Sequence, residues 1–324
     1  MMQRRSALLG TAGLLALPGL AQAQGNWPER PIRYVIGAAA GGVSDIFLRI
    51  MEARLREQLG QPLVIDPRPG AGGMVGAEQA ARSPPDGYSF FVNHIASHGI
   101  GPSLYKRLAF DPLKDLPGVC RLARMPNVLI VKGDSPLRDV AALIAFMKAN
   151  PERATFASAG TGTSSHLSGV LLGLRTGIDT THVPYRGTAP SMAAVMNGEV
   201  LFAIDNAPAS RQQVLGGLLR ALAVSTAERA PTMPELPSLQ ESGVADFDVA
   251  SWYGIAAPAG VPRAITERLG ATILAALADP GIAQRIRDFG AEPAPLPAAE
   301  FDAFMRQQVA AWAPVVRASG ASVD

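Results

Sequence analysis

The sequence predicts an α/β protein with two lobes, each built from a mainly parallel sheet flanked by helices. Apolar runs typical of strands alternate with amphipathic runs typical of helices, and this alternation favours parallel sheets covered on both faces. The alternation starts a second time near the middle of the chain. The length of 324 residues exceeds that of a usual single domain, and 48% hydrophobic with 17% charged residues is typical of a well-packed globular protein.

The first series of elements begins with the buried strand IRYVIG at residues 32–37. A cluster of small residues then leads into a helix that starts near Val43. A strand is expected at 62–66, followed by a glycine-rich turn, a helix at 74–82 and a strand at 86–93. These elements belong to the first lobe.

The second series begins with a strand at residues 127–133. Three helices and three strands follow it in alternation, with the helices at 137–151, 164–177 and 189–198, and the strands at 154–160, 181–187 and 200–206. Together they predict a second, similar lobe.

The segment after residue 262 is helical in pattern, with helices expected at 263–278, 280–290 and 298–318. It has too few strands to form a third sheet, so we expect it to complete the first lobe. The chain would cross between lobes near Met125 and Ala250. Lobe 1 then comprises residues 24–125 with 250–324, and lobe 2 comprises residues 126–249. Proteins of this kind bind ligands between the lobes.

The first 23 residues have the features of a secretory signal peptide. Arg4 and Arg5 precede an uncharged run at 6–20, and AQA at 21–23 has the small-x-small form of a cleavage site. The apolar run is shorter than a spanning helix needs, and no basic flank follows it. We expect cleavage after Ala23 and export to the space between two membranes, with the general secretory and twin-arginine routes both open.

The charge balance excludes a general attraction to polyanions. The chain has 29 Lys and Arg against 27 Asp and Glu, and loss of residues 1–23 removes two arginines and no acid. The remaining chain has a formal net charge of zero and therefore no general attraction to nucleic acid or anionic lipid. Any preference for an anion has to be local. The single cysteine, Cys120, cannot form an internal disulfide and lies far from the cleavage site.

The stretch AAAGGVSD at residues 38–45 is the first candidate binding site. A strand, a tight turn and a helix start leave backbone N–H groups without partners, and the helix dipole adds positive potential there. The G-x-G-x-x-G and P-loop motifs are missing, which argues against a nucleotide. Two other uses stay open: the glycines can serve only the turn, and the acid can cap the helix. The candidates are Ala39, Ala40, Gly41, Gly42, Ser44 and Asp45.

A second turn of the same kind lies in lobe 2, between the strand 154–160 and the helix 164–177. Here hydroxyl groups add further donors. One such turn in each lobe predicts that both grip a single carboxylate across a cleft, although a serine at a helix start can equally be a plain N-cap. The candidates are Ser158, Gly160, Thr161, Gly162, Thr163 and Ser164.

Four more candidates lie near the ends of lobe 2 strands: Tyr185, Arg186, Asp205 and Asn206. Arg186 suits either a second, distal carboxylate of the ligand or an acid of its own turn. Asp205 can accept a hydrogen bond from a ligand amine or hydroxyl, or from a neighbouring loop. The end of a strand is the expected place for a cleft residue in an open α/β sheet.

Histidines raise two alternatives. His94 and His98 have the spacing of metal ligands on a helix, but they follow a strand and no carboxylate or cysteine completes a site, so we expect no metal. Ser97 and His98 are instead candidates to line the cleft. A hydrolase would need a serine with a base in reach, yet no G-x-S-x-G motif occurs and His166 is too close in sequence to Ser164. We expect neither an enzyme nor a cofactor.

Several strings in the chain resemble those of the tripartite tricarboxylate transporter solute receptors, also called Bug receptors. RPGAGG at 68–73 and HVPYRG at 182–187 are the specific ones. WPERPIRYVIGAAAGGVSD, PDGYSFF, LRALAVSTAERAPTMPELPSLQESG and WYGIAAPAGVP also occur in the same order as in that family. The resemblance runs from Trp27 to the C-terminus.

The resemblance implies a type II-like, two-lobed periplasmic binding protein that captures a small carboxylate and presents it to membrane permease subunits, as a monomer. In that family main-chain groups of the two turns hold the carboxylate, which corresponds to residues 39–45 and 158–164 here. Reporting the ligand to a membrane sensor is the alternative output. The first strand ends in Gly37 and Ala38, where these receptors commonly have a proline and an aromatic residue. Ligand identity therefore stays open.

Overall fold

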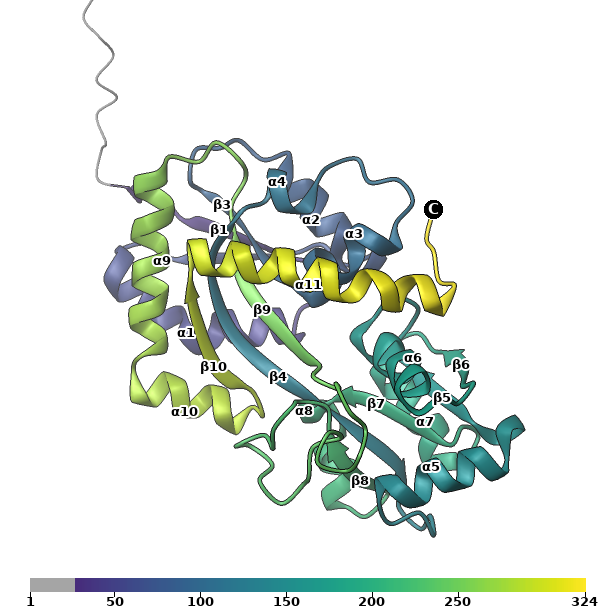
Figure 1. Cartoon of the computed structure of the whole chain (residues 1–324). Coiled ribbons are helices and arrows are strands. Elements are labelled where there is room, and N and C mark those ends of the chain that lie inside the picture. Colours follow the sequence, from purple (N-terminus) through teal and green to yellow (C-terminus); the bar gives the residue numbers. More distant parts are fainter. Residues whose placement is uncertain (1–26) are drawn as a thin grey trace, which may run out of the picture.

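One long strand, β4 (Gly118–Lys132), runs through both halves of the molecule (Figure 1). The computed structural model describes residues 27–324, so the signal peptide predicted at residues 1–23 lies outside the described part. The first half contains three strands with parallel pairing around a central one, as the sequence predicts. In chain order its elements are β1 (Ile32–Ile36), α1 (Val43–Leu59), β2 (Leu63–Pro67), η1 (Ala71–Gly73), α2 (Met74–Ala81) and β3 (Ser89–His94).

Short helical segments connect this first series to β4. A single turn of π-helix follows the last parallel strand directly, where the sequence suggests a loop. The connecting segments are η2 (Ile95–Ile100), α3 (Gly101–Leu104) and α4 (Pro112–Asp115).

The second half repeats the arrangement of the first. Its parallel strands surround β5, and helices alternate with them as predicted. A final helix and strand, α8 and β8, go beyond the elements expected from the sequence. The elements are α5 (Val140–Ala149), η3 (Pro151–Arg153), β5 (Thr155–Ser158), α6 (Ser164–Thr176), β6 (Thr181–Pro184), α7 (Thr188–Asn197), β7 (Phe202–Asn206), α8 (Ala207–Leu215) and β8 (Leu219–Val224).

The chain then returns to the first half. Figure 1 shows the last helix crossing from the first half toward α6 of the second. The strand before that helix, EPAPLP, reads as a loop in sequence because proline cannot donate to a sheet, but it lies at an edge, where proline is tolerated. The returning elements are β9 (Ala250–Ala256), α9 (Arg263–Leu277), α10 (Pro280–Asp288), β10 (Glu292–Pro297) and α11 (Ala298–Ser319).

The sheet is continuous because β4 changes partners along its length. The strand order is β2-β1-β3-β9-β4-β7-β5-β6, with β8 and β10 also paired to β4. From Gly118 to Pro126 the strand pairs antiparallel with β9, and from Asn127 onward it pairs antiparallel with β7 and β8. The sequence suggests a strand only from residue 127, because Pro126 reads as a break. In the structure this proline marks the change of partner.

Two large apolar cores lie on the helix-covered faces of the sheet. In the first half, Phe47 of α1 packs edge-on against Phe289, with ring centroids 5.8 Å apart. The other core joins both halves, because α11 contributes Trp312 and Val315 next to Leu167 of α6. Helix α11 therefore ties the end of the chain to the second half.

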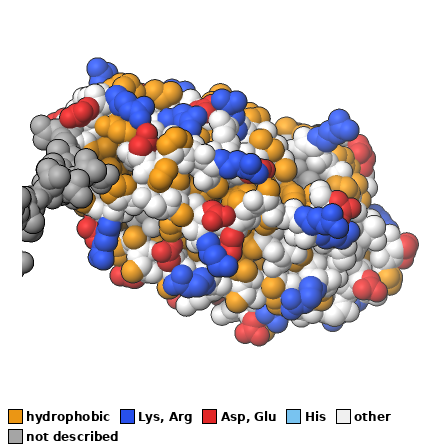
Figure 2. Space-filling model, turned by 90° about the horizontal axis from the view of Figure 1, so that it is seen from above, with side chains coloured by type: hydrophobic (Ala, Val, Ile, Leu, Met, Phe, Trp, Pro, Cys, Tyr) orange, Lys and Arg blue, Asp and Glu red, His pale blue; other side chains and the backbone are white. Residues whose placement is uncertain are grey.

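The face of the molecule seen from above carries charges of both signs (Figure 2). Figure 2 shows acidic and basic side chains interspersed with hydrophobic ones over the face seen from above, without a large area of one sign. Such a face agrees with the near-neutral charge balance read from the sequence. Within residues 27–324, no helix is both long and apolar enough to cross a membrane.

We predict that Gly254→Ala will lower the stability of the fold. A Cβ at Gly254 of β9 would overlap the Phe301 ring and lie 2.8 Å from the Cys120 carbonyl oxygen. Overpacking of this kind costs about 1–3 kcal/mol of unfolding free energy, which urea denaturation would measure. Gly99→Ala is the control, because its Cβ would meet only ordinary contacts near 3.5 Å. Equal midpoints for the two variants would contradict the prediction.

Candidate functional site

A cavity of about 290 Å³ lies between the two halves, at the carboxyl ends of β1, β3, β5 and β7. This edge is where open α/β sheets bind ligands. The antiparallel strand β9 closes the cavity from one side with Ser251 and Tyr253. The other lining residues are Gly37, Ala38, Val43, Ser44, Gly70, Gly72, Gly73, His94, Ile95, Ala96, Ala159, Thr163, Ser164, Ser165, Thr188, Asp205 and Asn206.

Helices α1, α6, α7 and α8 all begin at this cavity. Their first or capping residues line it, and the amides of Val43, Ser44, Ser164 and Ser165 have no hydrogen-bond acceptor within residues 27–324. The first turn of a helix leaves such donors unpaired, and the helix dipole makes that end positive. Four helix starts therefore create a region of positive potential built from main chain.

The first predicted turn satisfies most of its own amides. The Gly41 amide donates to the Asp45 carboxylate at 2.7 Å, and the Gly42 amide donates to the Ala39 carbonyl at 3.1 Å. Ala39, Ala40 and Gly41 are exposed on the outer side of the turn. Of the six candidates in this turn only Ser44 lines the cavity, because the helix begins at residue 43 and the preceding residues form its cap.

Asp45 is buried and completes that cap. Its second oxygen lies 2.9 Å from the Arg49 guanidinium. In the structure, the contacts of Asp45 are therefore those of a residue that caps the helix, which is one of the two uses considered from the sequence.

The second predicted turn is also internally bonded. Ser158 accepts from the Gly160 amide at 3.1 Å, and the Gly162 amide donates to His166 Nδ1 at 3.1 Å. Thr163 Oγ1 donates to the Gly160 carbonyl at 2.7 Å. Of the six candidates here, the structure brings Thr163 and Ser164 to the cavity, while Ser158, Gly160, Thr161 and Gly162 shape the turn behind them.

A buried hydroxyl network joins the two halves beside the cavity. Ser251 of β9 donates to Asn206 Oδ1 at 2.9 Å, and its oxygen lies 3.2 Å from Ser164 Oγ and 3.4 Å from Asn127 Oδ1. Asn127 Nδ2 in turn donates to Ser168 Oγ at 3.3 Å. The network connects β4, β9, α6 and the end of β7, so it fixes the positions of Ser164 and Asn206.

Among the described residues that line the cavity, Asp205 is the only acid, and none is a lysine or arginine. Asp205 is 1% exposed, and one carboxylate oxygen accepts from the Asn206 amide at 2.7 Å. Within the described residues the other oxygen has no hydrogen bond of normal geometry, with the Thr188 hydroxyl as the neighbouring donor. Burial raises the pKa of Asp205 to about 6, although hydrogen bonding by the Asn206 amide and the Thr188 hydroxyl favours the charged form and lowers it. The unpartnered oxygen is free to accept a hydrogen bond.

His94 also lines the cavity, as a neutral imidazole. Burial lowers the pKa of His94 to about 4, and its Nδ1 accepts from the Ala96 amide at 3.2 Å. Tyr253 lies beside it, with ring centroids 5.9 Å apart, and burial together with the charge of Asp205 raises the pKa of the tyrosine hydroxyl. The cavity therefore contains neutral donors, one carboxyl group and aromatic surface.

The remaining predicted residues lie outside the cavity lining. His98 is buried and stacks on Phe91 at 5.9 Å, and Ser97 Oγ donates to the His94 carbonyl at 3.0 Å. Tyr185 packs against an apolar cluster, and Arg186 is exposed. Within residues 27–324, no group of three or more potential metal ligands occurs.

Sequence reasoning missed several lining residues, among them Ser251, Thr188 and Gly37. His94 is the last residue of β3, and because cleft residues are expected at the ends of strands in an open α/β sheet, the sequence could have identified it. Ser251 lies within an antiparallel strand and carries no such signal. Gly37 is needed for packing, since a Cβ there would lie 2.5 Å from the Gly73 Cα.

One pair of side chains resembles part of a hydrolase site. Ser158 Oγ lies 2.6 Å from His182 Nε2, and the His182 ring stacks on His166 at 3.9 Å. Ser158 is fully buried and also bonded to Gly160, so no substrate carbonyl can reach its oxygen. The pair serves to hold the turn.

Comparison with known proteins extends over nearly the whole chain. The model of a family described as "Tripartite tricarboxylate transporter family receptor" matches residues 47–321. BugT of Bordetella pertussis is 32% identical over 327 residues, covering 99% of both chains. Among solved structures, Rpa4515 of R. palustris with adipate has a TM-score of 0.83 at 34% identity, covering 91% of this chain and 99% of that one. MatC of Rhodopseudomonas palustris with bound malate has a TM-score of 0.78 at 30% identity, covering 90% and 100%.

We predict that Asp205→Asn will stabilise the protein at pH 8. The variant should also lack the fall in unfolding free energy that the wild type shows as the pH rises from about 4 to 6. The folded protein holds the Asp205 proton more tightly than the unfolded chain does, so ionisation on raising the pH through about 6 lowers the stability. The gain at pH 8 is on the order of 3 kcal/mol, measured by thermal or urea unfolding. Asp134→Asn, at an exposed acid, is the control. A variant that is less stable than the wild type at pH 8 would contradict this account.

Proposed function

This chain belongs to the tripartite tricarboxylate transporter receptor family, and we propose that it captures a small carboxylate in the cavity between its halves and delivers it to permease subunits of a tripartite tricarboxylate-type transporter. The family is one of periplasmic solute-binding proteins and not of enzymes. We propose that the chain acts in the periplasm as a monomer, after cleavage of the predicted signal peptide.

The observation that carries this proposal is the convergence of four helix starts on a cavity whose described lining has no cation. An anion held there must accept from amides and hydroxyls. One hydrogen bond with a charged partner contributes about 1.5–3 kcal/mol, so a few convergent donors reach the roughly −8 kcal/mol of micromolar binding. We therefore assign the carboxylate to the first turns of α1 and α6, near Ser44 and Ser164.

The division into two lobes supports closure around the ligand. We propose that residues 24–125 with 250–324 form one lobe and residues 126–249 the other. The register of β4 supports this division, because the strand changes partner between Pro126 and Asn127 and Ala250 is the residue paired with Pro126. Lobes joined by two such strands close by hinge motion.

The chemistry of the cavity narrows the class of ligand. Relatives were solved with adipate and with malate, and a cavity of about 290 Å³ suits a molecule of that size. Asp205 offers an oxygen without a hydrogen bond of normal geometry, and no arginine is among the described residues that line the cavity to hold a second carboxylate. We propose a ligand with one carboxylate at the helix starts and a hydroxyl or amine that donates to Asp205, with Asn206 beside it.

The functional test is a thermal-shift screen of small carboxylates on the mature protein, followed by calorimetry on those that stabilise it. Mass spectrometry of the released compound should recover it unchanged. Deletion of the gene should abolish uptake of that compound into the cell. Unchanged uptake would instead favour the alternative of a receptor that reports to a membrane sensor.

We predict that removing single main-chain donors will weaken carboxylate binding. Val43 and Ser164 are the first residues of α1 and α6, a position where proline fits a helix while deleting the amide hydrogen. The preceding Gly42 and Thr163 already have the extended ψ that proline requires of its neighbour. Val43→Pro and Ser164→Pro should each raise the Kd about tenfold or more by calorimetry.

The matched controls keep the amide and change only the side chain. Val43→Ala should leave the Kd nearly unchanged, and Ser164→Ala should have a smaller effect than Ser164→Pro, since it keeps the amide and removes only the hydroxyl that contacts Ser251. If the proline and alanine variants bind equally well, the carboxylate does not lie at these helix starts.

A further inference from the structure

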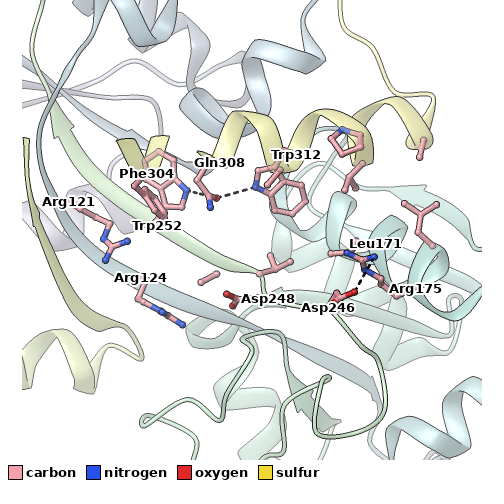
Figure 3. Close-up of a pocket in the computed structure, with 17 residues that line it drawn as sticks. Arg121, Arg124, Leu171, Arg175, Asp246, Asp248, Trp252, Phe304, Gln308 and Trp312 are labelled. Carbon is pink, nitrogen blue, oxygen red and sulfur yellow. Dashed lines mark hydrogen bonds and ion pairs between the residues drawn. The ribbon is translucent and has the colours of Figure 1, made fainter. Parts of the chain in front are cut away.

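A second, larger cavity lies on the opposite face of β9. Its volume is about 540 Å³, and it shares no lining residue with the first cavity. Successive side chains of a strand point to opposite faces, so Ser251 and Tyr253 face the first cavity while Ala250 and Trp252 face the second. Figure 3 shows the second cavity between β4 and β9 on one side and α11 on the other, with α6 at its far end.

Two arginines of β4 stand unpaired at one end of this cavity. No carboxylate lies within ion-pair distance of Arg121 or Arg124 in the described part of the chain; Glu292, the register partner of Arg124, pairs with Arg287 instead. Arg121 donates through Nε to the Ala294 carbonyl, and its other nitrogens have no acceptor among residues 27–324. Burial, with the like charge of Arg124, lowers the pKa of Arg121 to about 10, so an anion would relieve this repulsion.

The acids of the cavity are engaged elsewhere. Asp246 lies 4.0 Å from Arg175 at the α6 end, and Asp248 accepts from the Ala227 amide at 3.1 Å. Three arginines and two aspartates line the cavity in total. Asp248 and Gln308 keep one further polar atom each, and the unpaired positive charge lies in the guanidinium groups of Arg121 and Arg124 at the β4 end, both labelled in Figure 3.

Rigid aromatic side chains form the wall between the two ends. The indole N–H groups of Trp252 and Trp312 both donate to Gln308 Oε1, at 3.1 and 3.3 Å, which fixes their orientation. Phe304 packs edge-on against Trp252 at 5.4 Å, and Arg121 lies over its ring at 4.7 Å. Leu171 of α6 continues the apolar surface. A charged end joined to an apolar wall is complementary to an amphipathic molecule.

We propose that this cavity is a second binding site, for an amphipathic carboxylate whose head pairs with Arg121 and Arg124 and whose apolar tail lies along Trp252 and Trp312. The volume falls in the range of small-molecule sites. The head can form bidentate pairs with guanidinium groups, which are the strong ones among charged hydrogen bonds. The proposal does not depend on what the first cavity binds.

The test is titration of the full mature chain with decanoate, by calorimetry and by tryptophan emission. Two of the three tryptophans of the chain line this cavity, so binding should change the emission. Arg124→Gln, at an exposed position, should raise the decanoate Kd about tenfold, and Arg121→Gln/Arg124→Gln should raise it further. Decanol, which lacks the charge, should bind at least about tenfold more weakly than decanoate.

Two variants separate the cavity from nonspecific effects. Ala311→Trp places a large side chain into the cavity from the exposed side of α11 and should abolish decanoate binding by calorimetry, the measurement that its added tryptophan does not disturb. Arg317→Gln removes an exposed arginine of α11 outside the lining and should leave the decanoate Kd unchanged. The unfolding midpoint of each variant shows whether the fold is kept. The proposal is overturned if no binding is seen at millimolar decanoate. It is also overturned if the wild type, Arg124→Gln and Ala311→Trp bind decanoate with equal affinity. If this face captures a protein partner and does not bind decanoate, the cavity is a docking surface instead.

Discussion

The site between the halves depends on main-chain amides that the fold leaves unpaired. Each helix start contributes donors that cannot bond within the helix, and in this protein α1, α6, α7 and α8 bring their starts to one cavity. The neighbouring turns do the opposite, since Gly41 and Gly162 donate to side chains of their own helices. Internal bonding of the turns holds the helix starts in place, and the unpaired amides are the donors that we propose for the anion. Binding by amides depends on geometry, because none of these donors can be moved by a side-chain rotation.

The second constraint is the sharing of β4 and β9 by the two halves. A strand that pairs with one set of partners and then another makes the two sheets continuous, and the Ser251 network lies where these strands meet the cavity. The hydroxyl of Ser251 has one proton and faces oxygens of Asn127, Asn206 and Ser164. It can donate to only one of them at a time.

Much of the fold could be predicted from the alternation of apolar and amphipathic runs, which correctly indicated the parallel strands around β1 and β5. The predicted strand at 127–133 was too short, because proline in sequence suggests a break and only the pairing shows that β4 continues through Pro126. Strand β10 was missed for the same reason. For the candidate site, a turn precedes a helix at both places that the sequence suggests, but periodicity cannot distinguish the residues that cap a helix from those that follow the cap. The structure therefore places Ser44 and Ser164 at the cavity and Gly41 and Gly160 behind it. Ser251 reaches the cavity only through the antiparallel return of the chain, which has no local signal.

The alternation of side chains along β9 has a mechanical consequence. One strand forms a wall of both cavities, with Tyr253 and Trp252 on its two faces. A bend of that strand toward one cavity moves it away from the other, so the volume of one cavity decreases while that of the other increases. Two occupants that each favour a different bend must influence each other's affinity by the same factor, whichever arrives first.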